Sequence, residues 1–214
     1  MLRFAMIAAA LLAAGPVKAG SAILPMREQA AVIDRWLATR VETVLPGLMR
    51  RSEIDMWVII SREYNEDPVI RTFLPATWQA ARRTTILLIH DRGGDQPLET
   101  LAVSRYAVGE TFQSAWDREL HGDQWRRLSG LIAERNPRRI GVNVSSDFAL
   151  ADGLSHSDHE RFLSVLPADL RERVVSAEAL AIGWLETRTP DEMAVYPHIC
   201  RIAHEILAEG LSEA

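Results

Sequence analysis

Several features that would assign a function at once are missing from the sequence. Cys200 is its single cysteine, so an intrachain disulfide is impossible and the fold must depend on its hydrophobic core. The chain contains no Gly-x-Ser-x-Gly motif, no glycine-rich phosphate loop and no His-Glu-x-x-His motif. It also has no internal repeat and no low-complexity tract. These absences remove the familiar motifs of serine hydrolases, nucleotide-binding proteins and zinc peptidases.

An excess of basic charge is missing as well. The 24 Lys and Arg residues are outnumbered by 29 Asp and Glu residues, and the net charge is −5. This balance argues against a general nucleic-acid-binding protein. The arginine pairs at 82–83, 126–127 and 138–139 are scattered, and we interpret them as solvated ends of secondary-structure elements. A hydrophobic content of 48% with 25% charged residues is typical of a globular protein.

The only long apolar run lies at the N-terminus, from Phe4 to Ala14, after the basic residue Arg3. Gly15 and Pro16 end the run, and small residues follow up to Ala19. A membrane span needs about 20 apolar residues, so the alternative of a retained anchor is less favoured. We therefore predict a signal peptide over residues 1–19 and an exported protein, periplasmic or extracellular.

Hydrophobic periodicity in the rest of the chain predicts a single α/β domain with a mixed sheet flanked by helices. The turn at 91–95 separates two apolar runs, which indicates an antiparallel pair of strands. Strands are expected at 56–60, 84–90, 98–108, 139–144 and 173–175, and helices at 26–48, 123–134, 155–166 and 177–184. Helices and strands alternate, but the antiparallel hairpin predicts a mixed sheet rather than a purely parallel one.

A helix with a strong start signal follows this domain. In the run 189–192, Thr189 and Glu192 can form a capping box, and Pro190 suits the first helical position. Val195, Ile199, Ile202 and Ile206 then follow at helical spacing, although Pro197 is expected to kink the helix. We interpret 187–214 as a connector helix whose apolar stripe packs against another domain. Such packing would contribute about 1.5–3 kcal/mol for each fully buried side chain.

Three stretches of the sequence resemble the N-terminal domain of the creatinase/prolidase/Xaa-Pro aminopeptidase (M24) metallopeptidases. They are MWVIISREYNEDPVIRTFLP, RRIGVNVSSDFALADGLS and LETRTPDEMAVYPHICRIAHEIL. The most specific part is the order basic residue, Thr, acidic helix start and amphipathic helix, which begins here at Arg188. The resemblance implies a creatinase N-terminal, ribonuclease H-like fold over residues 26–186.

The resemblance also implies that catalysis belongs to a second domain. In that family a second, pita-bread domain carries two Asp, one His and two Glu that hold a pair of divalent metals (Mn, Zn or Co) and activate water. None of those residues can be matched to a position in this sequence, so no cofactor is expected in this chain. The expectation is a substrate-access and dimerisation domain, a fragment inactive alone, with peptide substrate bound only by the full-length form. The alternative is a stand-alone periplasmic binding or interaction module that has lost the enzyme domain.

Few residues are candidates for chemistry. In the resembling family the small domain of one subunit covers the active site of the other, and Tyr64, Asn65 and Trp78 lie in loops suited to such a cover or dimer contact. Alternatively, Trp78 packs in the core while Tyr64 and Asn65 shape a turn.

Two other clusters have competing interpretations. His156 and His159 share a helix face and could meet one metal ion in a small hydrolase, but we favour a solvated, acidic first turn around Asp158. Cys200 could act as a nucleophile with His198 or His204, but we favour a small buried residue.

Overall fold

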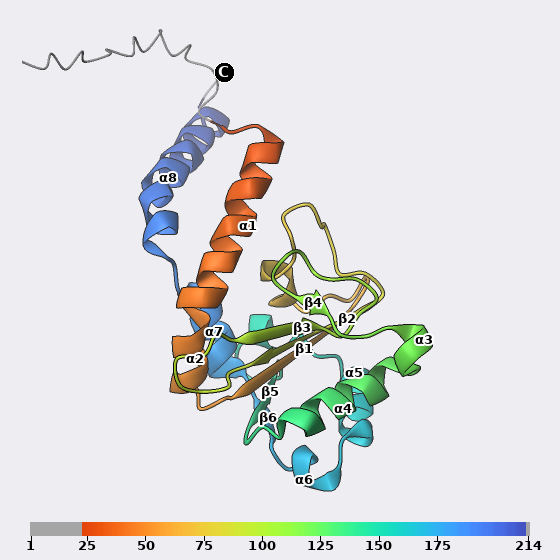
Figure 1. Cartoon of the computed structure of the whole chain (residues 1–214). Helices are drawn as coiled ribbons and strands as arrows, with labels where there is room; N and C mark the ends of the chain where they lie inside the picture. Colours follow the sequence, from red (N-terminus) through yellow and green to blue (C-terminus); the bar gives the residue numbers. More distant parts are fainter. Residues whose placement is uncertain (1–22, 213–214) are drawn as a thin grey trace, which may run out of the picture.

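The computed structural model describes residues 23–212, so the predicted signal peptide lies outside the described residues. Its centre is a six-stranded sheet with the order β4-β3-β2-β1-β5-β6 (Figure 1). The strands are β1 (Met56–Arg62), β2 (Thr84–His90), β3 (Glu99–Ala102), β4 (Gln113–Ser114), β5 (Ile140–Val142) and β6 (Val174–Ser176).

The sheet is mixed, which confirms the predicted fold class. β1 pairs with β2 along its whole length in antiparallel register, and the second half of β2, from Leu87 to His90, pairs antiparallel with β3. The pairs β1–β5, β5–β6 and β3–β4 are parallel. β4 lies where the sequence indicates only a loop, because two exposed residues are too few to show a strand period.

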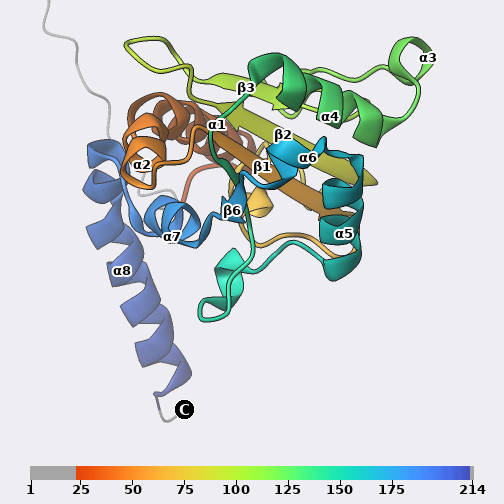
Figure 2. The ribbon, with the colours of Figure 1, turned by 90° about the horizontal axis from the view of Figure 1, so that it is seen from below.

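Helices cover both faces of the sheet. In Figure 2, α1 (Met26–Thr43), α2 (Leu45–Arg51) and α7 (Glu178–Glu186) lie on one side, and α4 (Gln124–Arg135), α5 (His156–Val165) and α6 (Ala168–Arg171) on the other. The remaining helical elements are α3 (Arg118–His121), α8 (Pro190–Gly210) and the 3₁₀ turns η1 (Ile70–Thr72) and η2 (Ala149–Ala151). Within residues 23–212, no helix combines the length and the apolar character needed to cross a membrane.

The two layers explain why β1 reads as an unbroken apolar run. Trp57 and Ile59 belong to the core cluster under α1, α2 and α7. Met56, Val58 and Ile60 belong to the cluster under α4 and α5. Since both faces of the strand are buried, alternation between apolar and polar residues is lost.

The predicted helix over 26–48 is in fact two helices, and this corrects the expected boundary at Pro46-Gly47. α1 ends at Thr43, and Val44 separates it from α2. Pro46 lies in the first turn of α2, where its missing N–H removes no intrahelical hydrogen bond. The proline therefore starts a helix here.

The junction between α7 and α8 is fixed by Arg40 from α1. Its guanidinium lies 4.0 Å from the ring centroid of Trp184 and donates a hydrogen bond to the Trp184 carbonyl oxygen. It also lies 3.8 Å from the Glu192 carboxylate. On the opposite side, the Trp184 ring stacks on Phe73 with centroids 4.5 Å apart. Burial lowers the pKa of Arg40, and the Glu192 carboxylate opposes that effect.

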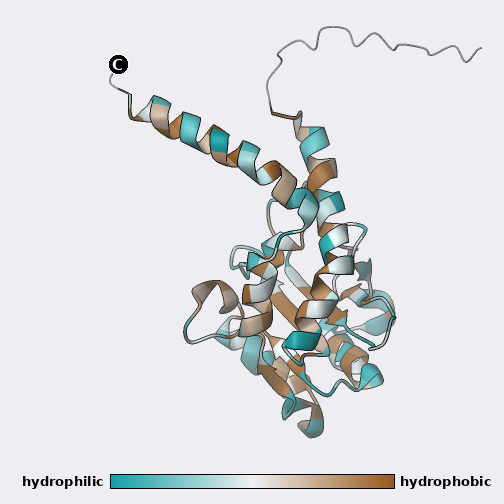
Figure 3. Cartoon of the chain, turned by 90° about the vertical axis from the view of Figure 1, so that its left-hand side faces the viewer, coloured by the Kyte–Doolittle hydropathy of each residue, from teal (hydrophilic) through white to brown (hydrophobic). Residues whose placement is uncertain are grey.

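The predicted capping box at the start of α8 is confirmed. Thr189 Oγ1 accepts a hydrogen bond from the Glu192 backbone N–H (3.3 Å), and Glu192 Oε2 accepts one from the Thr189 N–H (2.7 Å). The helix continues past Pro197 to Gly210, and none of its residues is buried. α8 leaves the domain at its first turn and diverges from α1 (Figure 3).

Candidate functional site

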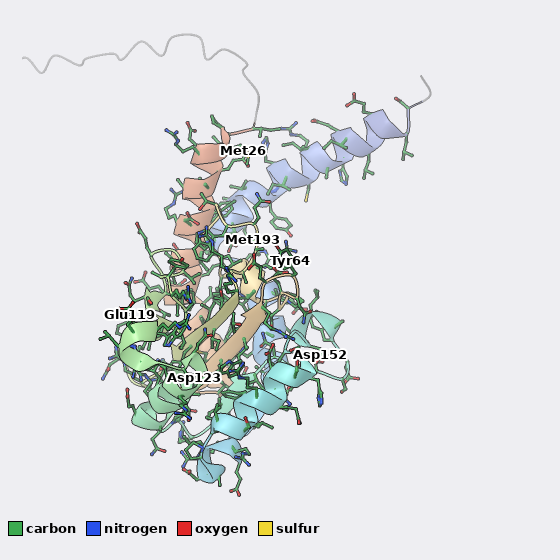
Figure 4. The ribbon with its side chains drawn as sticks, turned by 90° about the vertical axis from the view of Figure 1, so that its right-hand side faces the viewer. Met26, Tyr64, Glu119, Asp123, Asp152 and Met193 are labelled. Carbon is green, nitrogen blue, oxygen red and sulfur yellow. The ribbon has the colours of Figure 1, made fainter. Side chains whose placement is uncertain are left out.

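The candidate functional site is a pocket of about 260 Å³ between the loop before β2, the segment after β3 and the region around β4. We call it the arginine pocket and define it by Trp78, Arg82, Arg83, Arg105, Tyr106 and Trp116. Figure 4 labels Tyr64, in the turn after β1, and Glu119 and Asp123, around the connection between α3 and α4.

Two hydrogen bonds join Glu63 to Arg83, one of the residues that line the pocket. The Glu63 N–H donates to the Arg83 carbonyl oxygen (2.6 Å), and the Arg83 N–H donates to Glu63 Oε2 (3.0 Å). Tyr64 and Arg83 have φ values of 69° and 54°. Residues other than glycine rarely adopt a positive φ, and such backbone conformations persist where surrounding contacts hold them. The turn after β1 and the segment before β2 are thus locked together.

Aromatic rings and one amide build the walls. The Arg82 guanidinium lies 4.4 Å from the Trp78 ring centroid, and Trp78 also packs against the core. Gln124 Nε2 donates to the carbonyl oxygens of Thr84 (3.0 Å) and Val103 (2.6 Å), which ties the start of α4 to β2 and to the residue after β3. These contacts keep the aromatic walls in place.

The electrostatics of the pocket are one-sided. Arg82, Arg83 and Arg105 line it, and no acidic side chain does. Within the described part of the chain, none of these three guanidinium groups takes part in an ion pair. Guanidinium groups bind carboxylates and phosphates through paired N–H donors, and aromatic rings bind flat or apolar groups. The arrangement is therefore suited to an anion with a ring or apolar group beside it.

The sequence analysis did not predict that Arg82, Arg83 and Arg105 line one pocket. Arg82 and Arg83 are exposed at the start of β2, in agreement with the interpretation as solvated ends. However, β2 and β3 are antiparallel, so the start of β2 and the segment after β3 meet at the same edge of the sheet. That pairing brings Arg105 to the same pocket. The signal available in the sequence was the predicted hairpin together with arginines at its two outer ends.

The three predicted cover residues have different surroundings. Trp78 lines the arginine pocket and packs partly against the core. Tyr64 is 92% exposed, and Asn65 donates its backbone N–H to the Arg62 carbonyl oxygen in the turn after β1. Tyr64 and Asn65 therefore lie in a turn and Trp78 packs only partly against the core, while a role in substrate access or dimer contact stays a prediction.

The expectation of a solvated first turn in α5 is wrong for Asp158. This carboxylate is only 7% exposed, and its Oδ2 lies 2.8 Å from Arg62 Nε at the end of β1. His156 is exposed and His159 half-buried. Over residues 23–212, no three His, Cys, Asp or Glu side chains gather in a way that could hold a metal ion.

The expectation of a buried Cys200 is also wrong. The thiol is exposed on α8, a helix none of whose residues is buried. His204 is exposed as well, and His198 Nδ1 lies 2.9 Å from an Arg201 nitrogen. The pairing of the thiol with either imidazole stays a prediction.

A buried polar chain lies elsewhere in the domain. Trp57 Nε1 donates to Asn143 Oδ1 (2.8 Å), and Asn143 Nδ2 donates to Asp67 Oδ2 (2.9 Å). Asp67 Oδ1 accepts the backbone N–H groups of Val69 (2.7 Å) and Ile70 (3.2 Å). Burial raises the pKa of Asp67, and these donors oppose that effect. The chain joins β1, β5 and the loop after β1, and its role is structural.

Comparison with known proteins gives a structural similarity but no sequence match. No family profile and no curated protein sequence matches the chain. Among solved structures, it is similar to an Xaa-Pro dipeptidase from Bacillus anthracis, with a TM-score of 0.42 and 13% sequence identity. The alignment covers 78% of this chain and 38% of the dipeptidase chain. The similarity concerns the fold alone.

Proposed function

We propose that this chain is the N-terminal, substrate-access domain of an exported metallopeptidase of the creatinase/prolidase type, and that it is inactive alone. The proposal begins from the resemblance of three sequence stretches to that family. The single observation that carries it is α8, whose start is anchored by a capping box and whose body buries none of its residues. A helix so well fixed at one end and so exposed elsewhere suits a connector between two domains.

The apolar residues of α8 define the surface that such a partner would cover. Ile199 and Ile206 are 51% and 63% exposed, and Val195 and Ile202 are half-buried. We call these four residues the α8 stripe. Burial of each side chain against a catalytic domain would contribute up to about 1.5–3 kcal/mol. The proposed division places the metal pair and water activation in that domain, while this chain shapes access to it.

A role in the dimer belongs to the same proposal. Tyr64, Asn65 and Trp78 would lie where the small domain of one subunit approaches the catalytic domain of the other. The exposure of Tyr64 and the location of Trp78 in the arginine pocket are compatible with contact to a second chain. The proposed export depends on the composition of residues 1–19.

The arginine pocket favours a second candidate function, a stand-alone periplasmic binding module. Three arginines whose guanidinium groups make no ion pair within residues 23–212 are notable in a chain with a net charge of −5, and such a pocket can bind a ligand without a catalytic domain. Under this alternative, α8 would contact a partner protein and not a covalently linked domain. The two candidates differ in what the DNA after codon 214 should encode.

The first test is peptidase activity of the purified chain from Gly20 onward. Dipeptides and Xaa-Pro peptides are incubated with Mn²⁺ or Zn²⁺, with a known prolidase as positive control, and the metal content of the chain is determined. We expect no turnover and no stoichiometric metal. Turnover with bound metal would overturn the proposal and direct mutagenesis to His156 and His159.

The second test is genetic. We expect the reading frame after codon 214, in the same frame or a shifted one, to encode a domain that carries two Asp, one His and two Glu in the family arrangement. An unrelated downstream sequence would favour the binding module.

A further inference from the structure

We propose that the arginine pocket binds the free C-terminal carboxylate of a short peptide, with the terminal side chain against its aromatic walls. The inference deepens the proposed function and rests on it only for the choice of a peptide. The charge and shape of the ligand follow from the pocket itself.

The charge of the ligand follows from the three arginines. Arg82, Arg83 and Arg105 face a common space with no carboxylate in its lining. The three side chains carry the same charge, so each would attract an anion placed in this space. A carboxylate can accept two parallel N–H donors from one guanidinium, which fixes its orientation as well as its position. Arg82 is also held in place by its stacking on Trp78.

A carboxylate fits better than a phosphate. Phosphate sites commonly use free backbone N–H groups at a helix N-terminus. The helix that starts at this pocket is α4, and Asp123 Oδ1 already accepts the N–H groups of Trp125 (3.0 Å) and Arg126 (2.9 Å). The Asp123 carboxylate therefore already occupies the backbone donors that a phosphate would need.

The size and the remaining polar groups favour the end of a peptide. A volume of about 260 Å³ lies at or below the lower end of the roughly 300–1,000 Å³ typical of small-molecule sites, which suits one or two residues. Ser104 Oγ donates to the Tyr106 carbonyl oxygen (2.7 Å), so its lone pairs are available to accept a hydrogen bond from a ligand N–H. Trp78 and Trp116 supply apolar surface for a ring such as that of proline.

The experiment measures binding of Gly-Pro and of its C-terminal amide to the chain from Gly20 onward. Isothermal titration gives the affinity, and NMR of the indole N–H groups reports whether Trp78 and Trp116 are perturbed. We expect the amide to bind at least about tenfold more weakly, because it cannot form the charge-assisted pairs. Added salt should weaken the binding of Gly-Pro. Equal binding of the two probes would overturn the proposal.

Arginine variants distinguish binding in the pocket from non-specific electrostatic attraction of the ligand. Arg82→Gln and Arg105→Gln should each weaken Gly-Pro binding about tenfold. Arg126→Gln is the matched control, since Arg126 is exposed, lies outside the pocket and makes no ion pair within residues 23–212. An equal loss in the control would mean non-specific attraction and would refute the site. Thermal unfolding of each variant checks that the domain remains folded.

Inorganic phosphate serves as the competing anion. If phosphate binds as tightly as Gly-Pro and displaces it from the same indole signals, the pocket is a phosphate site and the peptide proposal is wrong. The same NMR samples would reveal free glycine and proline if the chain hydrolysed the probe. Failure of the proposed function and failure of this inference are therefore distinguishable.

Discussion

At the scale of single residues, the buried chain Trp57–Asn143–Asp67 shows how one carboxylate can fix a loop. Asp67 accepts three hydrogen bonds and is fully buried. Gly153 leaves room for it, because a Cβ at that position would lie 2.3 Å from the Asp67 carboxyl group. The glycine is therefore required by close approach and not by its backbone conformation.

Replacement of Asp67 by Asn should destabilise the domain. The new amide would turn its NH₂ group either toward the NH₂ of Asn143 or toward the two backbone N–H groups, and Asn143 cannot rotate without losing Trp57. An unsatisfied buried donor costs about 1–3 kcal/mol of stability. The neutral amide also removes the cost of burying a charged carboxylate, so the net destabilisation is smaller. Urea unfolding measures the change, with exposed Asp95→Asn as the control.

The pH dependence of the stability of the wild-type chain and of Asp67→Asn tests the same contact. Because burial raises the pKa of Asp67, its contribution to stability is complete below the ordinary Asp pKa of the unfolded chain and is lost as pH rises through the raised pKa. The Asn variant should lack this decline. If both proteins have the same stability profile above pH 4, Asp67 does not titrate as described.

At the scale of elements, local signals and long-range contacts differ in how well the sequence predicts them. The start of α8 was predictable because its cap lies within four residues. The burial of Asp158 was not, since it depends on Arg62 from a distant strand. The arginine pocket likewise required the antiparallel pairing of β2 and β3, and the break at Val44 depends on how α2 packs in the core.

Thr189→Ala should loosen the first turn of α8. The substitution removes the acceptor for the Glu192 N–H, and loss of such a cap costs about 1 kcal/mol. Hydrogen exchange should show faster exchange in the first turn, with β1 and β2 unchanged. Glu192→Gln is the complementary variant, because glutamine still completes a capping box while the ion pair with Arg40 is lost. Unchanged protection in Thr189→Ala would mean that Arg40 alone holds the junction.

At the scale of the whole molecule, the described chain is a compact domain with an arm. α8 runs outward from the junction with α7 in every view (Figures 1 and 3). Exposed apolar residues in such numbers are uncommon on an element that has no partner surface. The arm therefore dominates how the isolated chain should behave in solution.

The isolated chain should self-associate through the α8 stripe in the absence of a covering domain. Sedimentation velocity should show a concentration-dependent dimer, and Ile199→Asn combined with Ile206→Asn should weaken it about tenfold or more, since each buried isoleucine contributes about 1.5–3 kcal/mol. Glu205→Gln on the same helix is a control for surface polarity. A strictly monomeric wild-type chain at high concentration would contradict this expectation.

The surroundings of Trp184 make this indole an internal reporter of the arm. It is fully buried, with the Arg40 cation on one face and the Phe73 ring on the other. A fixed charge over the ring shifts the energy of its excited state, and that charge also contacts Glu192 at the root of α8. Any event that reorients α8 should therefore change the fluorescence emission of Trp184. This buried indole would then report on the orientation of the connector helix.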